Sequence, residues 1–163
     1  MDALQLLDRA LSEFHQPVGI ASALGLKARC VHALSGFDEA APIYRQALEF
    51  EKTYPNVRTH LWVRFPWEIA KARRASLYDE ALQWLGFPQD PNVMFPIDRF
   101  QKATVLAIVA DSRGDLVAAK SHADAALRAA GMSRSPFSRH KNIGLVVGVE
   151  DWAAAALDAI LKK

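Results

Sequence analysis

The sequence predicts an all-α fold, and three observations support that class. Half of the 163 residues are hydrophobic, alanine is abundant, and runs of β-branched residues are few, which favours helices. Apolar residues recur at helical spacing in successive segments of the chain. Glycine or proline separates most of these segments, where a helix has to end. A chain of this length fits one domain, so we expect a single helical domain over residues 1–163.

The first half of the chain contains four predicted helices. Pro17 ends the first of them, Gly36 supplies the turn before the third, and Asp38 caps or opens that helix. Pro66 predicts a kink or a new helix start within the fourth. These helices are expected over residues 2–15, 20–35, 38–52 and 57–75.

The second half contains four more predicted helices and one irregular segment. A loop is expected over residues 89–94, and Arg113-Gly114-Asp115 reads as a tight turn. Beyond Gly131 the chain becomes basic and then apolar with interspersed glycines, which disfavours a regular helix. Helices are expected over residues 76–86, 96–112, 116–131 and 150–163, with an irregular strap over 132–149.

One motif recurs along these helices. Its clearest copy is the segment 35–49, which places Ala40, Tyr44 and Ala47 on one helical face after Gly-Phe-Asp-Glu. The small alanines let a neighbouring helix approach closely, and the tyrosine fills the gap between them. Weaker copies begin at Ala3, Ala81 and Ala119.

The recurring pattern resembles the second helix of the tetratricopeptide repeat (TPR) family. That resemblance implies a right-handed α-solenoid of antiparallel helix hairpins, about seven or eight helices in all. Repeats would occupy residues 1–131, and the helix over 150–163 would cap the open end of the core. An unrelated helical bundle with alanine-rich packing is the alternative.

In a TPR-like array the first helix of each hairpin lines a concave groove, which implies a set of partner-binding positions. Arginines there would suit carboxylates, and the groove would be mildly basic and aromatic. The Lys and Asn set with which some TPR domains clamp a peptide C-terminus is missing here. The implied partner-binding residues are Arg29, His32, Trp67, Arg73, Arg74, Gln101, Thr104 and Asp111.

Two simpler interpretations of these residues stay open. The basic residues from Arg64 to Arg74 could merely solvate one face of a helix. Trp62, Phe65 and Trp67 could be helix core, although aromatic residues beside arginines also suit a peptide-binding hot spot.

The strap over 134–149 could fold back over the array or dock into a second chain.

No catalytic or cofactor motif stands out. There is no glycine-rich phosphate loop, no nucleophile elbow and no His-Glu-x-x-His. Ser121, His122 and Asp124 point in different directions from one helix, and no two histidines have the spacing of a helical metal site. The single Cys30 excludes an internal disulfide and fits a reducing compartment. We therefore expect no cofactor, no metal and no enzymatic activity.

The sequence thus predicts a non-catalytic protein–protein interaction module that binds an acidic or C-terminal segment of a partner. A homodimer through residues 2–26 is a further hypothesis, because the first helix resembles half of a hairpin. Rival functions are a nucleic-acid-binding protein that uses residues 58–74 and 128–141, and an enzyme of unrecognised type. Neither a signal peptide nor a membrane-spanning run is evident, so we expect a cytoplasmic protein without a membrane partner.

Overall fold

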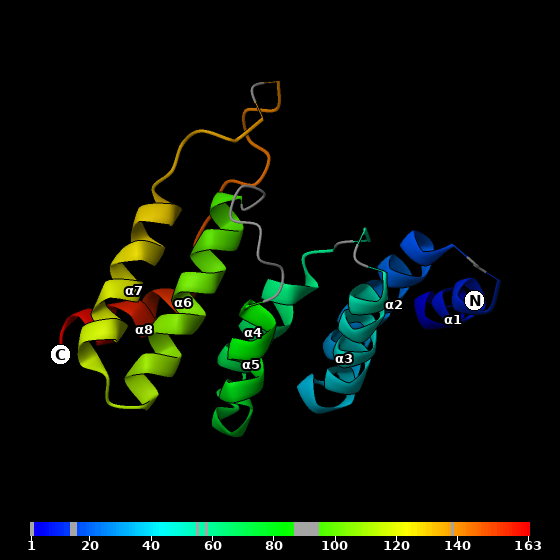
Figure 1. Ribbon diagram of the computed structural model, residues 1–163, viewed down its shortest axis with the longest axis horizontal. Coiled ribbons are helices and arrows are strands. Elements are labelled where there is room, and N and C mark those ends of the chain that lie inside the picture. Colours follow the sequence, from blue (N-terminus) through cyan, green and yellow to red (C-terminus); the bar gives the residue numbers. More distant parts are fainter. Residues whose placement is uncertain (1, 14–15, 55, 58, 87–94, 138) are drawn as a thin grey trace. The chain divides into compact units, whose positions relative to one another are not determined.

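Figure 1 shows the chain in a computed structural model, which describes residues 2–13, 16–54, 56–57, 59–86, 95–137 and 139–163. These residues form helices joined by turns and contain no strand, so the expected all-α class is confirmed. No helix among them has the length and apolar character needed to cross a membrane. The chain forms two compact units, Met1–Phe65 and Pro66–Lys163, and each is described by itself. The expectation of a single domain stays a prediction.

The first unit contains three complete helices and the start of a fourth. Helix α2 begins at Pro17, earlier than expected, because the fixed φ of proline and its missing N–H suit the first helical position. Helix α4 is shorter than expected and passes through Pro66 without a new start. The bounds are α1 (Ala3–Glu13), α2 (Pro17–Ser35), α3 (Phe37–Thr53) and α4 (Leu61–Lys71).

The core of the first unit forms around the clearest copy of the motif. Helix α3 packs against α2, and Ala40, Tyr44 and Ala47 are almost completely buried. The Phe65 ring stacks on Tyr44 with their centroids 5.2 Å apart. Helix α1 packs against α2 but buries no residue completely, and Ala3 is exposed. The motif therefore serves as core in α3 but not in α1.

The second unit is centred on the hairpin of α6 and α7. These two helices pack along each other, α5 packs against α6, and α8 packs on both α6 and α7. Ala119, Ala123 and Ala126 of α7 are fully buried, as is Ala81 of α5. The elements are η1 (Ala75–Leu77), α5 (Tyr78–Leu85), α6 (Pro96–Ser112), α7 (Leu116–Ala130) and α8 (Asp151–Leu161). The loop expected over 89–94 lies outside the described residues.

The segment between α7 and α8 has the irregular backbone that the sequence predicts. Turns replace a helix over the apolar run, and Gly144 and Gly148 both adopt a positive φ of 76°. The Ile97 N–H donates a hydrogen bond to the Gly144 carbonyl over 2.9 Å, which ties this segment to the start of α6. The following helix, α8, then covers one side of the α6–α7 hairpin.

Candidate functional site

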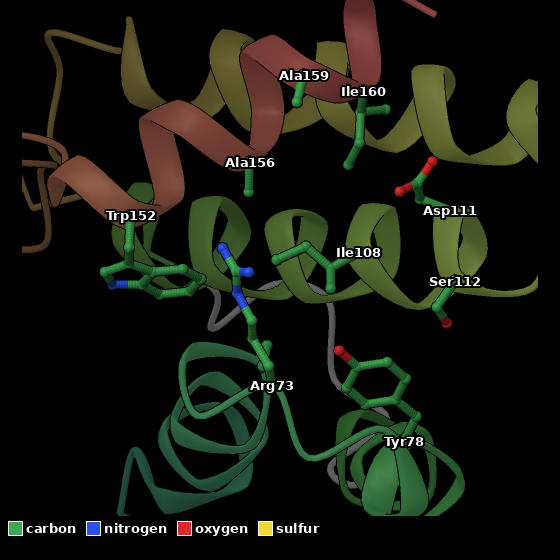
Figure 2. Close-up of a pocket in the computed structure, with 10 residues that line it drawn as sticks. Arg73, Tyr78, Ile108, Asp111, Ser112, Trp152, Ala156, Ala159 and Ile160 are labelled. Atoms are coloured by element: carbon green, nitrogen blue, oxygen red, sulfur yellow. The ribbon is translucent and has the colours of Figure 1, made fainter.

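A pocket of about 270 Å³ lies within the second unit (Figure 2). It is open to solvent and lined by the end of α4, the start of α5, the C-terminal half of α6 and one face of α8. Its walls are largely apolar, with a few polar groups that converge on the same space. The lining residues are Ala70, Arg73, Tyr78, Ile108, Asp111, Ser112, Trp152, Ala156, Ala159 and Ile160.

Arg73 reaches this pocket from an unusual backbone position. Helix α4 ends in a Schellman motif, in which the Arg74 N–H bonds to the Ile69 carbonyl and the Arg73 N–H bonds to the Ala70 carbonyl. Arg73 occupies the left-handed position of that motif with φ of 53°. Glycine is the usual residue there, because a side chain in this conformation costs about 1–2 kcal/mol.

Helix α6 ends in the same motif with the usual residue. The Asp115 N–H bonds to the Ala110 carbonyl, the Gly114 N–H bonds to the Asp111 carbonyl, and Gly114 has φ of 77°. The chain thus places glycine at one of two equivalent positions and arginine at the other. Strained backbone at a pocket is a recognised sign of a functional side chain, so Arg73 is the first candidate.

The charges around the pocket single out the same residue. Lys71 pairs with Glu150, Arg113 pairs with Asp79, and Lys163 pairs with Asp111. Arg73 forms no ion pair with any residue that the structure describes. Since Lys163 neutralises Asp111, the positive charge of Arg73 is not compensated by any residue that the structure describes.

Trp152 forms one side of the pocket and is held in place on two sides. Its indole N–H donates to the Glu150 carboxylate over 3.0 Å, and that carboxylate also binds Lys71. Its ring meets Trp67 edge to face, with the centroids 4.6 Å apart. Figure 2 shows the Arg73 side chain extending from the end of α4 toward α8, beside the Trp152 ring.

Tyr78 contributes a hydroxyl on the opposite side. Figure 2 shows this hydroxyl directed into the pocket. Burial raises the pKa of the Tyr78 phenol above its ordinary value, and the positive charge of Arg73 opposes that rise. The phenol therefore stays protonated at neutral pH and can donate a hydrogen bond.

This arrangement fits a small anionic group attached to an apolar body. A guanidinium binds a carboxylate through two parallel N–H donors, and an aromatic ring beside it offers apolar contact. The volume falls just below the range typical of sites for drug-sized molecules, so one or two side chains of a peptide fit better than a large ligand.

The structure brings together only part of the predicted partner-binding set. Arg73 and Asp111 line the pocket, and Trp67 lies directly behind its Trp152 wall. Asp111 continues a stripe of α6 that includes Gln101 and Thr104. Both of those residues are buried, and the Thr104 hydroxyl donates to the Phe100 carbonyl, so in this conformation they belong to the core.

The remaining predicted residues lie elsewhere. Arg74 is exposed but does not line the pocket. In the first unit, Arg29 is exposed on α2, and the half-buried His32 meets Phe37 edge to face at 6.1 Å. The partner-binding role of all these residues stays a prediction.

Three residues of the site escape reasoning from sequence. Tyr78 occupies a motif position that reads as scaffold, and Trp152 and Lys163 belong to a helix that reads as a cap. Nothing in their local pattern marks them, because they reach α6 through the packing of two helices distant from each other in sequence, α5 and α8. Arg73 was already in the predicted set, but its left-handed backbone is known only from the structure.

No cluster of three or more potential metal ligands occurs among the residues that the structure describes. Comparison of the chain with models of known protein families, with curated proteins and with solved structures finds no match. The resemblance to TPR proteins therefore rests on the motif alone.

Proposed function

We propose that this chain is a non-catalytic protein–protein interaction module that binds an acidic segment of a partner protein at the Arg73 pocket. The observation that carries the proposal is Arg73 itself: its backbone is strained, it lines a largely apolar pocket, and its guanidinium has no carboxylate partner among the described residues. Arg73 is exposed to solvent, and its guanidinium can bind a ligand carboxylate through two parallel N–H donors.

The pocket suggests what that segment contains. A Glu or Asp carboxylate would pair with Arg73 and accept a hydrogen bond from Tyr78. A neighbouring apolar side chain would contact Ile108 and the Trp152 ring. Such a segment would satisfy the polar groups and the apolar wall together, which is how compact interaction hot spots achieve affinity.

The proposal is tested with a labelled peptide rich in glutamate and leucine, followed by fluorescence anisotropy. A matched peptide with glutamine in place of glutamate is the ligand control. We expect the acidic peptide to bind more tightly, and Arg73→Gly to remove that difference. Glycine keeps the left-handed backbone, so the side chain alone is deleted.

Arg74→Gly is the matched protein control, because Arg74 is adjacent in sequence but does not line the pocket. It should keep most of the affinity. Equal binding of both peptides, or an equal loss in both variants, would contradict the proposal. A pull-down from native lysate with wild type and the Arg73/Arg74 double glutamate variant would then identify the natural partner.

We further propose the architecture that the motif implies, a right-handed TPR-like solenoid in a cytoplasmic protein. The α2–α3 and α6–α7 hairpins and their buried motif alanines support it. An experimental structure with the two units placed relative to each other tests the handedness. Sedimentation equilibrium tests the homodimer through residues 2–26, for which the exposed Leu6 and Val18 are the support.

A further inference from the structure

A second surface of the chain carries positive charge without compensation. From Ala125 to Val149 the sequence has no Asp or Glu but contains Arg128, Arg134, Arg139 and Lys141. None of these four forms an ion pair within the part of the chain that the structure describes. The other ion pairs of the second unit show that acids do accompany many of its cations. This segment therefore has a local positive potential despite a net charge of only +2.

The same segment exposes large apolar side chains. Met132, Phe137 and Ile143 are 40%, 50% and 48% exposed, and Val147 is 90% exposed. We name residues 132–137 and 139–149 the basic strap. Its apolar and basic side chains alternate along a short stretch, so the two kinds of surface lie close together.

The basic strap is held in position although many of its side chains face solvent. The Ile97 N–H bonds to the Gly144 carbonyl, and the Phe95 and Phe137 rings lie 5.5 Å apart between centroids. Figure 1 shows the segment, in orange, projecting beyond the C-terminal end of α7 and the N-terminal end of α6. The tether fixes its backbone near α6 and leaves Val147 exposed.

We propose that the basic strap binds the surface of a membrane that contains anionic phospholipids. Phe137, Ile143 and Val147 enter the boundary between head groups and acyl chains, while the arginines and Lys141 meet lipid phosphates and carboxylates. Such binding lies on the membrane surface and needs no spanning helix, so it departs from the expectation of no membrane partner, which rested on the lack of a spanning run. It is independent of the Arg73 pocket.

The exposed aliphatic residues favour this occupant over two others. A nucleic acid would use the basic residues and could stack on Phe137, but Ile143 and Val147 offer it nothing. An acidic peptide gains most from a groove, whereas the strap projects from the unit. A lipid surface uses the charges and the aliphatic side chains together.

The test is co-sedimentation of the full chain with vesicles of phosphatidylcholine, alone or mixed with phosphatidylserine. We expect binding to the mixed vesicles only, with loss on addition of salt. The triple variant Arg134→Gln, Arg139→Gln, Lys141→Gln should lower the partition coefficient at least about tenfold. Val147→Ser should lower it severalfold without changing salt dependence, since Val147 is too exposed to stabilise the fold.

Arg73→Gln is the matched control, because it removes a cation of the same unit outside the strap and should leave vesicle binding unchanged. Absence of binding to mixed vesicles at low salt would overturn the proposal. A second outcome would also overturn it. In that outcome the chain binds a single-stranded oligonucleotide tightly, the triple variant loses this binding, and Val147→Ser leaves vesicle binding unchanged. Circular dichroism on each variant confirms that helix content is retained.

Discussion

At the scale of single residues, the Schellman motifs that end α4 and α6 differ in the residue at the left-handed position. Gly114 ends α6 in the left-handed conformation at no steric cost, whereas Arg73 adopts the same conformation at the end of α4. Strained backbone positions of this kind cluster at functional sites, where the contribution of the side chain offsets their cost. Since Arg73 has no ion pair among the described residues and lines a pocket, ligand binding is the simplest gain.

Replacing Arg73 with glycine should therefore stabilise the protein while removing peptide binding. We expect the free energy of unfolding to rise by about 1 kcal/mol, because the strain is relieved. Urea denaturation measures the change. Arg74→Gly is the control, since Arg74 has a negative φ of −81° and glycine there relieves no backbone strain. A destabilised Arg73→Gly protein would mean that the arginine holds the fold together.

Tyr78 should make stability depend on pH in the alkaline range. Burial raises its pKa in the folded state, so above pH of about 10 the unfolded chain loses this proton first. The contribution of Tyr78 is complete below that pH and falls as pH rises toward the folded-state pKa. Tyr78→Phe should show a smaller fall in unfolding free energy across this range. Parallel curves for the two proteins would argue against the raised pKa.

At the scale of helices, the motif works through close approach. Ala40 is fully buried where α3 packs on α2, so Ala40→Leu should cost about 1–3 kcal/mol through overpacking. Gln46→Leu lies on the exposed side of the same helix and serves as the control. Equal stability of the two variants, by urea denaturation, would show that the motif is not a packing element.

The strap depends on one close contact with the start of α6. A Cβ on Gly144 would overlap the Phe95 ring, whereas a Cβ on Gly148 would meet no atom within 4 Å. Both glycines have φ of 76°, so Gly144→Ala and Gly148→Ala share the same backbone strain. Gly144→Ala should lose more stability, and proteolysis should cut its strap faster. Equal susceptibility would mean that the Phe95 contact does not hold the strap.

At the scale of the whole molecule, the pocket draws on segments far apart in sequence. Lys163 neutralises Asp111 at its edge, so Lys163→Ala should leave an unpaired carboxylate and weaken acidic-peptide binding at least about twofold. Stability should change by less than about 1 kcal/mol, as for most exposed ion pairs. Lys162→Ala, which breaks only the local pair with Asp158, is the control. Unchanged affinity in Lys163→Ala would mean that the charge of Asp111 does not affect peptide binding at the pocket.

The helices were largely predictable from sequence, and their misplaced ends have physical reasons. Pro17 reads as a stop but begins α2, because proline fits the first turn as well as it ends a preceding helix. Pro66 reads as a break but lies within α4, where burial of its neighbours holds the helix together. Local pattern alone does not decide between such alternatives.

The resemblance to TPR proteins, and not local pattern, made Arg73 and Asp111 candidates. The sequence by itself determined the helical class, the turn-and-helix motif and the irregular strap. Local propensity and periodicity suffice for these, because each depends on residues within a few positions of one another. Only the tertiary structure decided that Thr104 is core and that Tyr78 and Trp152 share a pocket with Arg73. Those facts depend on how α5 and α8 pack against α6, and no local pattern encodes the meeting of distant helices.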